Sequence, residues 1–277
     1  MILAVRNVIF KGGIILAAFS LCLIAAGAFF SFPAYPEAAA SAAMRSRGII
    51  QTLIKNLADS SSYVPFSTML GAVAYSLISI ILIHHYFEKT QSPEILFFGF
   101  FVISLSFEFA RVMIPLRIAF PFPAMYLITG TRLLIFGRHF GLFSLFAASV
   151  YAAGLNAQKQ QNAFFILILA AMVIALNVPV DSLVWDSTLM PLNGYNSMFT
   201  IVEAGILAVT ILTFLISAYT RGSKTYVFIG IGTFMVFAGR NIFLYSDTWI
   251  TPLPGLLLLA VGTWFVSSRL HKEYLWL

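Results

Sequence analysis

The chain has 277 residues, of which 60% are hydrophobic and 9% are charged. Soluble domains carry about 25% charged residues, so this composition excludes a soluble enzyme or a nucleic-acid-binding domain. The net charge of +6 therefore does not indicate nucleic acid as a partner. It is typical of the basic loops of a membrane protein.

Apolar runs of about 20 residues, the length that crosses a bilayer as a helix, recur along the whole chain. They predict an all-α fold, a polytopic helical membrane bundle that uses residues 1–277 as a single membrane domain. The expected transmembrane helices number about eight, at 12–34, 64–86, 95–116, 134–155, 163–183, 197–219, 225–246 and 250–268.

The first apolar run has two interpretations. Basic residues precede it and "AAASAA" follows it, which is also the pattern of a cleaved secretory signal peptide. The run is longer than the roughly 7–15 residues of a signal-peptide core, so a transmembrane helix is the favoured interpretation.

The loop at residues 35–62 has a helical pattern of its own. Ile50, Leu53, Ile54 and Leu57 follow the spacing of one helix face. We expect an outer amphipathic helix in this first loop, lying on the membrane surface or capping the bundle.

Residues 117–155 are too long for one transmembrane helix and too short for two. We expect one helix that begins near Leu133. The preceding outer segment contains Pro121 and Pro123 and is expected to be interfacial or re-entrant.

Basic residues predict the orientation, because cytoplasmic loops are enriched in Lys and Arg. Both termini are expected in the cytoplasm, with the protein in the cell (inner) membrane. The loop at 35–62 is an exception, since it also carries basic residues. The residues expected on the cytoplasmic side are Arg6, Lys11, Lys89, Lys159, Arg221, Lys224, Arg269 and Lys272.

Two similar segments suggest an internal repeat. "FARVMIPL" (109–116) and "AGRNIFLY" (238–245) each place Arg after a small residue, and a Pro-x-Pro pair follows each. The repeat would divide the chain into two four-helix halves, 1–158 and 159–277. Chance similarity between apolar helices is the alternative.

Charged residues inside the predicted helices are the main functional signal. An ionised group in hydrocarbon costs at least ~2.5 kcal/mol, so such groups pair with each other or line a wet cavity. Glu108 and Arg111 lie three residues apart and share a helix face. Pro115 cannot bond the Arg111 carbonyl, so we expect a kink there and a free acceptor.

Charges from other helices fall at the same depth, in the outer half of the membrane. We expect Glu108 to pair with an Arg from the fourth or seventh helix and Glu203 to pair with the remaining one. Gly232 and Gly239 predict close helix packing near Arg240. The candidate ligand-binding residues are Glu108, Arg111, Arg132, Arg138, His139, Glu203, Arg240 and Asn241.

The cluster would either hold the helices together or bind a ligand. Arginine presents a planar fork that suits carboxylate or phosphate, and the surplus of Arg favours an anionic small molecule or lipid headgroup. Asp181, expected on the same side, cancels part of this surplus.

Three functions follow from this cluster. A binding or sensory module for an anionic or amphiphilic ligand, acting through a membrane-protein partner, is favoured. A secondary transporter or transporter subunit is the first alternative, and an intramembrane enzyme acting on lipid or isoprenoid headgroups is the second. No catalytic residue can be named, because the common catalytic motifs do not occur. The spacing of the four histidines and the single cysteine predicts neither a metal site nor a cofactor.

Overall fold

The computed structural model describes residues 3–31, 63–87, 92–120, 122–180, 185–190 and 196–275. The helix expected around Ile50–Leu57 lies outside these residues, as do Lys89 and Asp181. The described elements are α1 (Leu3–Ser31), α4 (Val64–Tyr86), α5 (Pro93–Ser104), η2 (Leu105–Val112), α6 (Met113–Ala119), α7 (Ala124–Ala152), η3 (Ala157–Lys159), α8 (Gln160–Asn177), α9 (Asn196–Arg221), α10 (Thr225–Leu244) and α11 (Pro252–Leu275).

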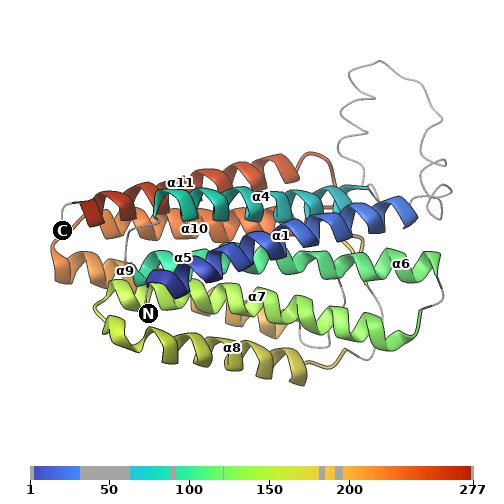
Figure 1. Ribbon diagram of the computed structural model, residues 1–277, viewed down its shortest axis with the longest axis horizontal. Coiled ribbons are helices and arrows are strands. Elements are labelled where there is room, and N and C mark those ends of the chain that lie inside the picture. Colours follow the sequence, from blue (N-terminus) through green and yellow to red (C-terminus); the bar gives the residue numbers. More distant parts are fainter. Residues whose placement is uncertain are drawn as a thin grey trace, which may run out of the picture.

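Eight helices within the described ranges are long and apolar enough to cross a membrane. They lie side by side along the long axis of the molecule (Figure 1). The predicted all-α membrane bundle is therefore confirmed. A division into two four-helix halves stays a prediction.

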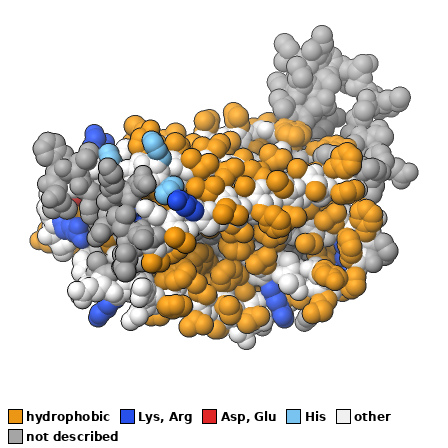
Figure 2. Space-filling model, viewed as in Figure 1, with side chains coloured by type: hydrophobic (Ala, Val, Ile, Leu, Met, Phe, Trp, Pro, Cys, Tyr) orange, Lys and Arg blue, Asp and Glu red, His pale blue; other side chains and the backbone are white. Residues whose placement is uncertain are grey.

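The chain begins its first helix and ends its last helix at the same end of the bundle (Figure 1). We call this the N/C end and the opposite end the distal end. Hydrophobic side chains cover most of the face in Figure 2, and the visible basic and histidine side chains gather mainly toward the N/C end.

The third span, made of α5, η2 and α6, forms the centre of the bundle. In its most apolar 18-residue stretch 89% of the residues are buried, whereas α8 and α9 each bury 17% of theirs. Charged side chains on this span therefore face protein rather than lipid.

The third span leaves α-helical geometry at η2, a 3₁₀ helix of eight residues. Ser76 of α4 lies at this point, where its hydroxyl donates to the Val102 carbonyl at 2.6 Å and lies 3.0 Å from the Ser106 hydroxyl. In an α-helix that carbonyl would receive the Ser106 N–H. The Leu105 N–H is directed to the same carbonyl, and the backbone continues from Leu105 in the tighter 3₁₀ pattern.

The predicted kink and free acceptor at Pro115 stay predictions. The departure from α-helical geometry begins at Leu105, upstream of the proline.

Residues 117–155 contain one spanning helix, as expected, but α7 begins at Ala124 rather than near Leu133. Pro123 precedes it with extended backbone at ψ 141°. At 1.5 Å per residue the 29 residues of α7 measure about 43 Å, more than the ~30 Å hydrocarbon core. A helix of this length crosses the core either with a tilt or with turns outside it.

The helices α10 and α11 approach each other through glycines. A Cβ atom on Gly239 would lie 2.6 Å from the Leu259 nitrogen, and one on Gly255 would lie 2.7 Å from the Phe243 nitrogen. No larger side chain fits without moving backbone. The predicted close packing at Gly239 is confirmed, and it fixes the position of the adjacent Arg240.

Candidate functional site: a buried polar cluster

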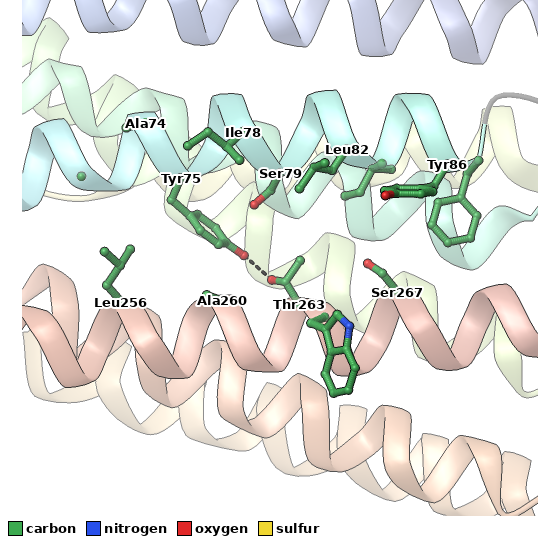
Figure 3. A pocket seen from close by; sticks show the side chains of 14 residues that line it. Ala74, Tyr75, Ile78, Ser79, Leu82, Tyr86, Leu256, Ala260, Thr263 and Ser267 are labelled. Carbon is green, nitrogen blue, oxygen red and sulfur yellow. Dashed lines mark hydrogen bonds between the residues drawn. The ribbon is translucent and has the colours of Figure 1, made fainter.

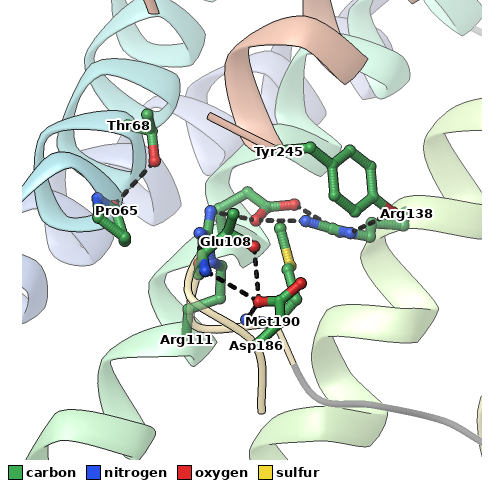
Figure 4. Close-up of polar contacts among 9 residues, drawn as sticks. Pro65, Thr68, Glu108, Arg111, Arg138, Asp186, Met190 and Tyr245 are labelled. Carbon is green, nitrogen blue, oxygen red and sulfur yellow. Dashed lines mark hydrogen bonds and ion pairs between the residues drawn. The ribbon is translucent and has the colours of Figure 1, made fainter. Parts of the chain in front are cut away.

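Glu108 is a buried carboxylate held between two arginines. Its side chain is 2% exposed. Arg138 Nε donates to Oε1 at 2.9 Å and Arg138 Nη2 donates to Oε2 at 3.0 Å, while Arg111 Nη1 lies 3.5 Å from Oε2. Figure 4 shows both guanidinium groups directed at the carboxylate. We call Glu108, Arg111, Arg138 and Tyr245 the Glu108 cluster.

Local geometry explains how the first pair meets. Side chains at i and i+3 lie in line along a 3₁₀ helix, so η2 places Arg111 directly beside Glu108. The predicted pairing of Glu108 with an arginine of the fourth span is also confirmed, because Arg138 belongs to α7. The close approach depends on Gly137, where a Cβ atom would lie 2.5 Å from Phe107 Cβ.

Arg111 also connects the cluster to the segment Trp185–Met190. Its Nη2 donates to the Thr188 carbonyl. This segment is folded around Asp186, whose Oδ1 accepts from the Thr188 N–H at 3.0 Å, the Thr188 hydroxyl at 2.7 Å and the Met190 N–H at 2.8 Å. The segment lies between α8 and α9, so the cluster is in the distal half of the bundle.

Arg138 has a second partner in Tyr245, which follows α10. Arg138 Nη1 donates to the Tyr245 hydroxyl at 3.2 Å, and the guanidinium carbon lies 5.4 Å from the ring centroid. Tyr245 is 52% exposed, so it covers the arginine at the edge of the cluster.

Arg240 lies close enough to Glu108 to interact with it electrostatically, but it forms no ion pair with any residue that the structure describes. It is 3% exposed. Within the described residues its side chain makes no ion pair or hydrogen bond, and Nη1 is buried without a partner.

His139 is buried beside this group. Its Nδ1 lies 2.9 Å from the Ile135 carbonyl, and because a carbonyl can only accept, Nδ1 carries the hydrogen. The other ring nitrogen, Nε2, is buried without a hydrogen-bond partner. Arg111 Nε and Nη1 are also buried without a hydrogen-bond partner, although Nη1 keeps its ion pair with Glu108.

The remaining candidate residues are not drawn into the cluster. Arg132 is exposed and Asn241 is half-buried, and neither has a side-chain contact with the cluster among the described residues. Glu203 interacts electrostatically with Arg138 and His139. It is half-buried and makes no ion pair within the described part of the chain, so its expected pairing with the remaining arginine is not found.

Two residues that hold the cluster were missed from the sequence. Tyr245 ends the segment "AGRNIFLY", one helical turn and a residue after Arg240. Asp186 begins "DSTLM", and an Asp two residues before Thr is a common signal for a turn that the Asp side chain closes. Neither pattern by itself indicates which arginine the residue meets.

Among the described residues, no group of three or more His, Cys, Asp and Glu side chains is arranged to hold a metal ion. No model of a known protein family matches the chain, and no curated protein matches its sequence.

Proposed function

We propose that this multi-pass membrane protein is a binding or sensory module. Its ligand is an anionic or amphiphilic molecule whose carboxylate or phosphate group binds beside the Glu108 cluster, at Arg240 and His139. The response would pass to a membrane-protein partner. The cell membrane, with both termini in the cytoplasm, is the proposed location, since seven of the twelve described Lys and Arg residues lie at the N/C end.

The unpaired Arg240 side chain is the observation that carries this proposal. A buried charge without a partner costs several kcal/mol, and an intramembrane arginine normally pairs or faces water. A cluster that only held the helices together would pair every arginine. Arg138 and Arg111 meet this condition through Glu108, and Arg240 does not.

The unpartnered donors define the chemistry of the ligand. Arg240 Nη1 and Arg111 Nε are N–H donors without acceptors. Arginine donors match the oxygens of carboxylate and phosphate, so an oxyanion supplies what these atoms lack.

A secondary transporter is the second candidate, and η2 favours it. Transporters of several folds place their substrate sites at interrupted transmembrane helices. The 3₁₀ stretch interrupts the third span at Glu108 and Arg111 themselves.

The experiment measures thermal unfolding of the protein in lipid nanodiscs with inorganic phosphate or acetate, against chloride at equal ionic strength. We expect phosphate or acetate to raise the Tm of the native protein. Arg240→Gln should fold but lose this increase. Arg132→Gln is the matched control, because Arg132 is exposed, and it should behave as the native protein does.

Equal Tm values in chloride and in both oxyanions would contradict the proposal, as would an unchanged response of Arg240→Gln. Proteoliposomes loaded with radiolabelled phosphate separate the two candidates. Release that depends on Arg240 would favour the transporter, whereas binding without release would favour the sensory module.

A further inference from the structure

A groove between α4 and α11 forms a second candidate site that shares no residue with the Glu108 cluster. Its volume is about 450 Å³. Figure 3 shows Tyr75, Ser79 and Tyr86 on one side and Ala260, Thr263 and Ser267 on the other. The groove runs along α4 from Gly71 to Phe87, and so it extends from the middle of the bundle to the N/C end.

The groove exists because its two walls pack against other helices. Gly239 and Gly255 hold α11 on α10, while Ser76 holds α4 on the third span. The facing positions Ala74 and Ala260 are too small to fill the space left between them.

Hydrocarbon is the occupant that the lining fits. The Tyr75 and Thr263 hydroxyls bond to each other, so they need no polar partner from a ligand. Among the described residues, no groove residue has a buried polar atom without a hydrogen bond. The remaining lining is largely aliphatic or aromatic, and Ile78 and Trp264, which are 59% and 65% exposed, leave the groove open toward the membrane.

The dimensions suit one chain of a membrane lipid. The α11 wall extends from Leu256 to Ser267, which at 1.5 Å per residue is roughly 16 Å. This length is about half of the ~30 Å hydrocarbon core, the depth that one acyl chain occupies in its own leaflet.

The N/C end of the groove suits an anionic headgroup. Tyr86 lies at this end of the groove, and aromatic side chains are enriched at headgroup level. His85 and Lys272 are exposed near the same end. The Lys and Arg residues described at this end are Arg6, Lys11, Lys159, Arg221, Lys224, Arg269 and Lys272.

We propose that this groove is a binding site for a phospholipid with an anionic headgroup. One acyl chain lies between α4 and α11, and the headgroup lies at the basic N/C end. Clusters of basic residues beside a membrane attract anionic lipids, and the lipid supplies the hydrocarbon that the walls leave uncovered.

Fluorescence of Trp264 tests the site, after Trp185, Trp249 and Trp276 are replaced by Phe. The protein is reconstituted with phosphatidylglycerol or phosphatidylcholine whose chains carry bromine, a short-range quencher. We expect quenching of Trp264 at lower fractions of phosphatidylglycerol, with about a fivefold preference for each basic side chain close to the headgroup. Ala260→Phe fills the groove and should remove this preference.

Val261→Phe is the matched control, because Val261 is the next residue on α11, is 41% exposed and does not line the groove. Native mass spectrometry of the protein with all four tryptophans supplies a second measurement. Native protein and Val261→Phe should retain phosphatidylglycerol, and Ala260→Phe should lose it. Equal quenching in Ala260→Phe and Val261→Phe would overturn the site, and equal quenching by the two lipids would overturn the anionic headgroup.

Discussion

Arg138 of α7 binds both carboxylate oxygens of Glu108, which lies 30 residues earlier in the third span, at 2.9 and 3.0 Å. Such a two-point contact fixes the angle between the two side chains as well as their distance. It therefore sets how α7 lies against η2. The cluster joins α7 to the third span in the distal half, and it leaves Arg240 beside a carboxylate that already has two cationic partners.

Glu108→Gln is expected to lower stability strongly. The variant keeps the shape of the side chain but leaves two buried arginines without a counter-charge, and breaking a buried pair costs about 3–5 kcal/mol when it is fully desolvated. The measurement is thermal unfolding in detergent. Glu203→Gln is the control, because Glu203 is half-buried and makes no ion pair among the described residues, so it should have the smaller effect. Equal decreases in Tm for the two variants would show that the ion pairs of Glu108 add no stability beyond that of an unpaired intramembrane carboxylate.

Arg138→Met combined with Glu108→Gln should recover part of that loss, because the double variant no longer buries the Arg138 charge. Coupling energies between polar pairs in membranes average ~0.6 kcal/mol, and a two-point charged pair should exceed that value. Unfolding of the two single variants and of the double variant gives the coupling. Additive losses would mean that the two side chains stabilise the fold independently.

Asp186→Ala should weaken the hold of Arg111 on the segment Trp185–Met190. The Asp186 carboxylate accepts three hydrogen bonds within the segment, and the Thr188 carbonyl that Arg111 binds depends on that turn. Proteolysis within this segment should become faster. Asp186→Asn, which retains the acceptor oxygen, should be intermediate. An unchanged cleavage rate in Asp186→Ala would show that other contacts hold the segment.

Much of the helical layout was predictable because it depends on apolar run length, which the sequence displays directly. The residues at which helices begin and end were not predictable where the first or last turns of the helix are polar. Residues 124–133 contain Gly130, Thr131 and Arg132, which weaken the apolar run. They were therefore expected to belong to an interfacial or re-entrant segment before the helix, whereas they form its first turns. The 3₁₀ geometry of η2 was not predictable either, and neither was the contact that Ser76 of another helix makes beside it.

The sequence predicted at which depth the charged residues of the candidate site lie, but not which of them contact one another. Depth placed Glu108, Arg111, Arg138 and Arg240 at one level, and the first three are in contact. Which face each helix presents depends on packing, and for that reason Arg132 was included although it is exposed.

Gly239→Ala is expected to destabilise the protein, because its new Cβ would lie 2.6 Å from the Leu259 nitrogen. Backbone would have to move, and overpacking of this kind costs roughly 1–3 kcal/mol. Gly205→Ala in α9 is the matched control, since nothing lies within 4 Å of its Cβ, and Ala favours a helix over Gly by about 1 kcal/mol. Thermal unfolding should show a loss for the first variant and no loss for the second. Equal Tm values would contradict the close packing of α10 on α11.

The orientation of the bundle can be tested by cysteine labelling after Cys22→Ser. Gln158→Cys lies at the exposed N/C end and Ser187→Cys at the exposed distal end. Because the N/C end carries most of the described Lys and Arg, the positive-inside rule places it in the cytoplasm. A membrane-impermeant maleimide should therefore label Ser187→Cys in intact spheroplasts and Gln158→Cys only after lysis. The reverse pattern would invert the proposed orientation and leave the bundle intact. Labelling of both positions from one side would contradict the arrangement of the spans itself, since the two positions lie at opposite ends of α8.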